Sequence, residues 1–489
     1  MITLQLGVGT DRSVSSCCLL QPRRTYLAKR LRIKGVMVVE KSIANPKFFS
    51  NKDLSRLFIP LMVEQFLELS VGLISSIMVA SVGEAAVSGV SLVEFVMALL
   101  ISIFAALATG GSVIAGQYLG NRKENEARKV SNQLVWFIGC IGLVVMALTY
   151  LMKNVILHGL FGQITEDVYA HASNYLMIVA LSIPSLALYN AGAAIFRTMG
   201  NSKFPMKIML YMNILNVVGS VALIYIFDMG TSGIAISTLI SRLGAAGIII
   251  FHAFNSKNIL FLEKTIRPKF DMGMIKQILA IGVPYGIENG MFYFGRLLVL
   301  SIVSTFGTAA IAANSVGGTI VTFQALPGMA IGLGLTVIIS RCAGAKDYEQ
   351  ARYYTKKIIR VIYIAQIISS FIILLLLSTI MKAYNLSEEA TMLTTKIVWS
   401  HAIAMMLIWP LGNSLPVVFR ASGDAKFPMI ISMFTMFFCR IALAYAFVYC
   451  LHMDLLATWI AIYCDWLLKG AIFVWRYING KWTKFHTVK

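Results

Sequence analysis

The chain has 489 residues, of which 58% are apolar and only 13% carry a charge. Soluble domains carry about 25% charged residues, so this composition excludes a string of water-soluble domains and predicts a polytopic membrane protein. The 42 Lys and Arg residues outnumber the 22 Asp and Glu residues, which gives a net charge of +20. In a membrane protein this excess is typical of positive cytoplasmic loops, so it does not indicate a nucleic-acid partner.

The first 52 residues contain no apolar run long enough for a signal peptide or a membrane span. They predict a basic, disordered cytoplasmic tail. Two alternatives stay open for this segment. Residues 23–34 could instead form a basic helix on the membrane surface, or translation begins at Met37.

Twelve apolar stretches that are long enough to cross a bilayer follow along the chain. They lie near residues 55–82, 88–118, 130–152, 167–198, 204–227, 231–254, 273–305, 311–343, 358–381, 391–419, 428–451 and 455–477. Pro184 and Pro410 lie inside two of them, where we expect a bend in the helix. The fold class that follows is an all-α membrane protein with twelve transmembrane helices.

The loops between these stretches alternate in charge. Basic residues gather near 122–129, 197–207, 257–276, 341–360 and 420–426, and in the tail after residue 475. The other loops are mostly acidic, as at Glu166, Asp167, Glu388 and Glu389. Because loops rich in Lys and Arg stay in the cytoplasm, this pattern places both termini there and requires an even number of spans.

The two halves of the chain match at a nearly fixed offset. Pro60 and Glu64 correspond to Pro284 and Glu288, and residues 196–206 (FRTMGNSKFPM) correspond to residues 419–429 (FRASGDAKFPM). Six stretches in each half predict two six-helix lobes related by a pseudo-twofold axis along the membrane normal. The expected divisions are a tail over 1–52, lobes over 53–256 and 273–478, a cytoplasmic linker over 257–272 and a basic tail over 479–489.

From about residue 52 to 478 the chain resembles the multidrug and toxic compound extrusion (MATE) transporters. The resemblance rests on the twin Phe-Arg-x-x-Gly-x-x-Lys-Phe-Pro segments, residues 117–120 (QYLG), residues 342–345 (CAGA) and residues 82–89. It implies a V-shaped bundle that exports organic cations or other toxic compounds in exchange for Na⁺ or H⁺. The sequence departs from the family at Ser75, where many relatives carry an aspartate implicated in coupling.

Placing an ionisable side chain inside a membrane span costs free energy, so such residues are candidates for function. Glu64 and Glu288 each follow a proline by four residues at equivalent repeat positions, and Glu68 lies one turn beyond Glu64. We expect these three carboxylates to couple transport to the driving ion. The alternative is a buried carboxylate held by structural hydrogen bonds.

Further polar, aromatic and methionine side chains on the same spans predict a substrate cavity between the lobes. These candidates are Gln65, Asn289, Arg296, Glu94, Tyr189, Met291 and Phe292. Arg296 lies two turns beyond Glu288 and is expected to serve as its counter-charge or as that of a carboxylate on the first span. Packing against polar neighbours is the alternative for Arg296, and ordinary helix packing is the alternative for the methionine.

Arg440 and Asp465 lie about equally far from the short loop between the last two spans, so antiparallel helices place them at one depth. We expect a structural ion pair there, with Lys469 on the face of Asp465. The cysteines lack the spacing of a metal site, and no phosphate-binding loop occurs, so neither a metal, a cofactor nor ATP-driven transport is expected.

The sequence thus predicts a monomeric, non-enzymatic antiporter of the plasma (inner) membrane, whose partners are the lipid bilayer and a small organic, cationic substrate. Na⁺ or H⁺ is the expected coupling ion. A flippase for lipid-linked saccharides is the alternative function, and a scaffold or receptor is a third. A flippase would need a strongly cationic cavity for diphosphate, whereas the four intramembrane glutamates outnumber Arg296 here.

Overall fold

The computed structural model describes residues 26–33, 36–43, 48–159, 165–263 and 269–485. Residues 1–50 and residues 51–489 form two separate units. In the first unit, β1 (Tyr26–Ile33) pairs with β2 (Val36–Ile43) as an antiparallel hairpin. The hairpin differs from the disordered tail or surface helix that the sequence predicts. Three of the four residues over 36–39 are valines, whose branched side chains favour an extended backbone.

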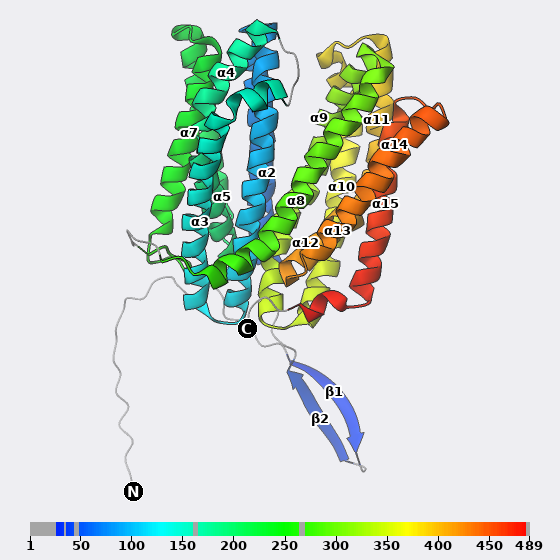
Figure 1. Cartoon of the computed structure of the whole chain (residues 1–489). Coiled ribbons are helices and arrows are strands. Elements are labelled where there is room, and N and C mark those ends of the chain that lie inside the picture. The colour runs from blue at the N-terminus through cyan, green and yellow to red at the C-terminus, as the bar shows by residue number, and fades with distance from the viewer. Residues whose placement is uncertain (1–25, 34–35, 44–47, 160–164, 264–268, 486–489) are drawn as a thin grey trace. The chain divides into compact units, whose positions relative to one another are not determined.

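The second unit is helical and consists of two lobes (Figure 1). The N-terminal lobe contains α1 (Asn51–Ala80), α2 (Glu84–Gly120), α3 (Glu124–Leu151), η1 (Val155–Gly159), α4 (Glu166–Ala180), α5 (Ile183–Thr198), α6 (Lys203–Val221), η2 (Ala222–Ile226) and α7 (Gly230–Ala253). The C-terminal lobe contains α8 (Met272–Val303), η3 (Ser304–Phe306), α9 (Thr308–Gly344), α10 (Tyr348–Tyr384), α11 (Glu388–Leu407), α12 (Trp409–Ser422), α13 (Lys426–Thr435), η4 (Met436–Ala442), α14 (Leu443–Tyr445), η5 (Ala446–Cys450), α15 (Leu456–Ile478) and η6 (Lys481–Lys484).

The expected twelve spans are confirmed. Within the described residues, ten helices are long and apolar enough to cross a membrane, and two bent helix pairs bring the number of spans to twelve. The bends of 50° lie between α4 and α5 and between α11 and α12. Pro184 and Pro410 are the second residues of α5 and α12, where proline interrupts the preceding helix because it lacks an amide donor.

The two lobes are in direct contact at the end that carries the α2–α3 and α9–α10 turns, and their helices splay apart towards the other end (Figure 1). Here α2 packs against α8 and α9, and α1 packs against α9. A Cβ atom at Gly344 would lie 1.9 Å from the Gln117 carbonyl oxygen, and one at Gly120 would lie 2.1 Å from that of Arg341. Glycine is therefore required for the backbones of α2 and α9 to approach this closely.

Side chains also join the lobes at this end. The Gln117 amide donates to the Ala421 carbonyl at 3.0 Å, and the Arg341 guanidinium donates to the Thr198 carbonyl at 2.6 Å. Both acceptors lie within three residues of the twin Phe-Arg segments recognised in the sequence. The repeated motifs thus meet where the lobes touch.

Candidate functional site

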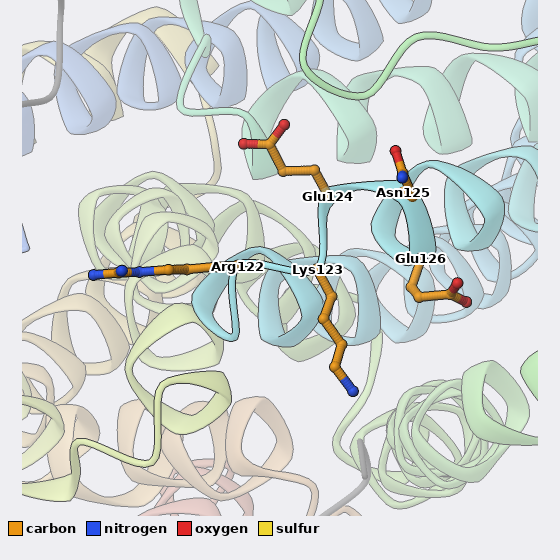
Figure 2. A pocket seen from close by; sticks show the side chains of 5 residues that line it. All are labelled: Arg122, Lys123, Glu124, Asn125 and Glu126. Carbon is orange, nitrogen blue, oxygen red and sulfur yellow. The ribbon is translucent and has the colours of Figure 1, made fainter.

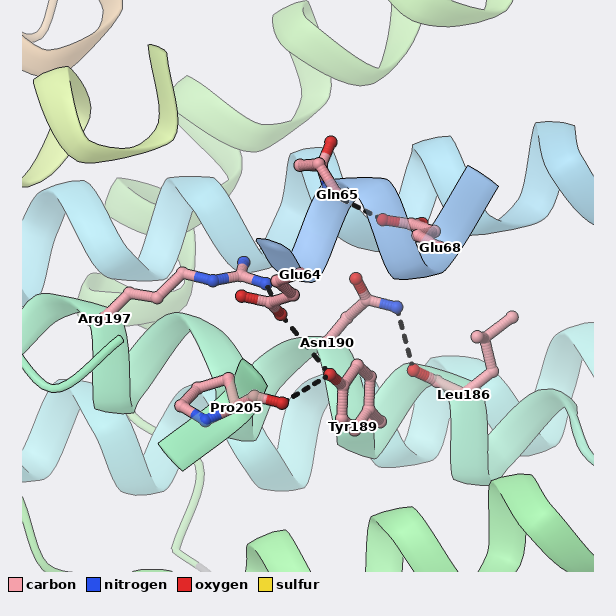
Figure 3. A network of polar contacts seen from close by, with 8 residues as sticks. All are labelled: Glu64, Gln65, Glu68, Leu186, Tyr189, Asn190, Arg197 and Pro205. Atoms are coloured by element: carbon pink, nitrogen blue, oxygen red, sulfur yellow. Dashed lines mark hydrogen bonds and ion pairs between the residues drawn. The ribbon is translucent and has the colours of Figure 1, made fainter. Parts of the chain in front are cut away.

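Glu64 of α1 is fully buried in the N-terminal lobe and forms an ion pair with Arg197 of α5 (Figure 3). Its Oε1 atom lies 2.5 Å from Arg197 Nη2, and the Tyr189 hydroxyl approaches the same oxygen at 3.4 Å. The Tyr189 hydroxyl also lies 3.4 Å from the Pro205 carbonyl, so its hydrogen bonds are long and weak. The buried carboxylate is therefore neutralised mainly by one arginine.

Glu288 of α8 is held in the same way in the C-terminal lobe. Its Oε2 atom accepts from Arg420 Nη1 of α12 at 2.8 Å, and its Oε1 atom accepts from the Ser432 hydroxyl at 2.8 Å. The Arg420 guanidinium also stacks on Tyr285, 4.1 Å from the ring centroid. Both carboxylate oxygens of Glu288 are thus engaged by side chains of its own lobe.

The two ion pairs are repeat equivalents, since the glutamates and the arginines recur at nearly the same offset in the sequence. Both arginines belong to the last helical turn before a basic loop, where a cation also interacts favourably with the helix dipole. From the sequence alone, Arg197 and Arg420 are expected only to add positive charge to cytoplasmic loops. Both halves of the sequence contain a Pro-x-x-x-Glu motif and, later, a Phe-Arg motif, and this shared recurrence is the signal that could have identified the two arginines.

Glu68 and Glu94, by contrast, are bonded by neutral groups. The Gln65 amide donates to Glu68 at 2.6 Å (Figure 3), and the buried Tyr175 hydroxyl donates to Glu94 at 2.6 Å. No Lys or Arg nitrogen of the described chain lies within 4 Å of either carboxylate. Neither carboxylate therefore has a cationic side chain in direct contact among the described residues.

The other expected cavity residues separate into distinct environments. Asn289 donates to the Ser102 carbonyl at 3.3 Å and so ties α8 to α2. Met291 is half-buried, and Phe292 is 46% exposed beside Tyr293, with ring centroids 6.0 Å apart. Arg296 is exposed and is not the partner of Glu288, because Arg420 occupies that place.

The expected ion pair of Arg440 with Asp465 is not formed within 4 Å, although the two charges are near enough to attract. Asp465 pairs with Lys469 at 3.7 Å, whereas the Arg440 guanidinium lies over the Phe292 ring at 4.8 Å from its centroid. Arg440 belongs to the π-helical turn η4, which packs against α15, the helix of Asp465. Equal depth therefore brought the two residues near each other but did not predict that Phe292 would be the direct neighbour of the guanidinium.

Two further polar contacts were not expected from the sequence. Buried His401 of α11 lies 2.8 Å from Gln324 of α9 through its Nδ1 atom, among aromatic side chains that include Trp459 and Trp466. Asp424, between α12 and α13, receives two bonds from Arg476 at 2.8 and 2.6 Å. Burial raises the pKa of Asp424, and the Arg476 bonds oppose this rise.

The sequence pattern of the MatE family matches residues 60–222 and again residues 284–446. The chain belongs to the MatE family. Both matches begin at the proline that precedes the paired glutamate, so the family pattern contains the repeat found in the sequence. MatE proteins are the MATE transporters, which makes this chain a membrane transporter.

Curated MatE relatives match over almost their whole length. "Uncharacterized transporter YisQ" of Bacillus subtilis is 27% identical over 86% of this chain and 93% of its own. "Probable multidrug resistance protein NorM" of Thermotoga maritima is 23% identical over 88% of this chain and 93% of its own.

Solved MATE structures share the fold. A MATE-family multidrug resistance transporter of the MOP superfamily, in an outward-facing conformation, superposes with a TM-score of 0.81 at 19% identity and covers 88% of this chain and 96% of its own. A MOP-superfamily transporter from Pyrococcus furiosus, described as having a reversed polarity of its binding pocket, gives a TM-score of 0.82 at 19% identity and covers 89% and 97%.

One surface depression lies outside this MatE interior, at the α2–α3 turn. It is lined by the five consecutive residues 122–126, and their side chains point in different directions (Figure 2). Nothing converges there that could bind a substrate. Among the described residues, no group of three or more His, Cys, Asp or Glu side chains is arranged to hold a metal ion.

Proposed function

We propose that the protein is a secondary active antiporter of the plasma (inner) membrane that exports small organic compounds in exchange for Na⁺ or H⁺ by alternating access. Membership of the MatE family and the multidrug resistance names of its relatives support this function over a saccharide–lipid flippase. The positive turns near Arg122 and Lys346 support a cytoplasmic location for the end at which the lobes touch. The splayed end then faces outward.

The observation that carries the proposal is the pair of carboxylates without a cationic partner, Glu68 and Glu94. An antiporter needs a site that the driving ion and the substrate occupy in turn, and a carboxylate can either titrate or coordinate a cation. At Glu68 and Glu94 an incoming cation displaces only a neutral amide or phenol. At Glu64 and Glu288 it would have to displace an arginine.

We therefore assign coupling first to Glu68, and we extend the assignment to Glu94, which the sequence placed in the substrate cavity. Glu64 and Glu288 remain part of the proposed coupling machinery as the carboxylates that the two arginines position. Gln65 and Tyr175 orient the carboxylates of Glu68 and Glu94. Met291, Phe292 and Tyr293 provide the apolar and aromatic surface for an organic compound.

Transport into vesicles tests the proposal. Ethidium uptake is measured in inside-out vesicles that contain the purified protein, energised separately by a Na⁺ gradient and by a pH gradient. We expect one of the two gradients to drive uptake at least fivefold above protein-free vesicles. A Glu388→Gln variant, altered at an exposed carboxylate at the start of α11, serves as the matched control. Uptake that neither gradient stimulates contradicts the proposed function.

A further inference from the structure

Two arginines of the C-terminal lobe, Arg296 of α8 and Arg440 of η4, lie close together without a carboxylate partner. α8 packs against η4, and the Arg440 guanidinium lies 4.8 Å from the ring centroid of Phe292, which is one helical turn before Arg296 on α8. Arg440 is only 8% exposed, and its Nε atom makes no hydrogen bond. Of the described carboxylates, none lies within 4 Å of either side chain. A buried cation without a partner is costly, so this pair calls for an explanation.

The neighbouring carboxylates of this lobe have other partners. Glu288 is bound by Arg420, and Asp465 by Lys469. Asp465 lies near enough to Arg440 for their charges to attract, but its salt bridge within 4 Å is to Lys469. Neither Arg296 nor Arg440 therefore has a carboxylate of its own among the described residues.

The surroundings of the pair suit an organic molecule rather than a bare ion. The Arg440 guanidinium stacks on Phe292, which leaves its planar N–H groups free to bind an oxyanion. Arg296 extends towards Gly318 of α9. A Cβ atom added to that glycine would lie 3.5 Å from Arg296 Nη2. Tyr293 lies within electrostatic reach of both Arg296 and Glu68, and packs against Phe95 of α2 at a centroid distance of 6.0 Å. Tyr293 thus links the neighbourhood of Arg296 to α2 of the N-terminal lobe.

We propose that Arg296 and Arg440 form a binding site for the anionic group, a carboxylate or phosphate, of a transported organic compound whose apolar part contacts Phe292 and Tyr293. The inference rests on the proposed transport function and extends its substrate class from organic cations to compounds that also carry an oxyanion. Zwitterions fit best, because their cationic group can approach Glu68 or Glu94. Arginine is suited to this role, since its fork of donors matches both carboxylate and phosphate.

Equilibrium binding to the purified full-length protein tests the site independently of transport. The probes are norfloxacin, which carries a carboxylate and a cationic amine, and its methyl ester, which keeps only the amine. We expect the wild-type protein to bind the acid at least tenfold more tightly than the ester. Arg296→Gln and Arg440→Gln should each reduce this preference to about twofold or less, whereas Arg440→Lys should retain part of it.

Exposed Lys382 at the end of α10 provides the control, and Lys382→Gln should keep the full preference. Because Arg440→Gln alters a buried residue, exposed Arg296→Gln decides the test if that variant does not fold. Equal binding of acid and ester by the wild type, or an unchanged preference in Arg296→Gln, overturns the anion site. If the acid is preferred but neither gradient drives ethidium uptake, the transport proposal fails while the binding site stands.

Discussion

Arg420 donates to Glu288 at 2.8 Å inside the C-terminal lobe, although the two residues are 132 positions apart in the chain. Arg197 and Glu64 repeat this contact in the N-terminal lobe. The bonds hold the first helix of each lobe to the helix that ends in the Phe-Arg motif of the same lobe, α5 or α12, and they lie near the end where the lobes meet. We expect them to stabilise each lobe as a unit during transport.

Removing one member of the C-terminal pair should be more harmful than removing both. Arg420→Gln leaves Glu288 as a largely buried, uncompensated charge, which typically costs about 3–5 kcal/mol. The double variant Glu288→Gln/Arg420→Gln should regain at least half of the lost thermal stability. Melting temperatures of the purified variants measure this. A double variant that is less stable than either single variant would contradict an ion pair as the main interaction.

The ion pair of Glu64 with Arg197 should also be needed for stability, whereas the Tyr189 hydroxyl beside it should contribute little. Tyr189→Phe removes only the 3.4 Å contacts of its hydroxyl, so it should change the free energy of unfolding by less than about 1 kcal/mol. Arg197→Gln should cost several times more, because Glu64 is fully buried. Comparable losses in the two variants would show that Tyr189 contributes more than its hydrogen bonds indicate.

Asp465 should be coupled to Lys469 rather than to Arg440. A double-mutant cycle with Asp465→Asn and Lys469→Met should give a coupling of about 0.5–3 kcal/mol, because the two side chains are 3.7 Å apart and largely buried. The corresponding cycle with Arg440→Met should give a smaller value. Chemical or thermal unfolding measures both. If Arg440 shows the stronger coupling, the sequence-based pairing was right in solution.

The topology rests on the loop charges and can be tested directly. A cysteine inserted between Glu388 and Glu389 lies at the start of α11, at the end of the molecule opposite to the basic turns. A membrane-impermeant maleimide should label it from outside intact cells. Labelling that requires access to the cytoplasm would invert the proposed orientation.

The sequence predicted the spans, the two bends and the repeat because hydropathy and proline act locally. It did not predict which charges meet. Glu64 and Arg197 are far apart in the chain, and their contact depends on how α1 and α5 rotate about their axes. Arg440 illustrates the same limit, because its direct neighbour is the Phe292 ring of α8 rather than Asp465. Composition and spacing thus found the candidate residues but not their partners.

The coupling assignment is tested by separating the two kinds of carboxylate. Glu68→Gln and Glu94→Gln remove charges that only neutral groups bind, so the protein should fold while gradient-driven ethidium uptake falls at least tenfold in the double variant. Glu64→Gln/Glu288→Gln removes carboxylates that arginines neutralise, so its first effect should be on stability. Pairing each of these changes with its arginine, as Glu64→Gln/Arg197→Gln and Glu288→Gln/Arg420→Gln, should restore much of the stability and reveal any remaining loss of transport. If the Glu68→Gln/Glu94→Gln protein transports normally while the stable ion-pair variants are uncoupled, coupling belongs to Glu64 and Glu288, as the repeat symmetry of the sequence first indicated.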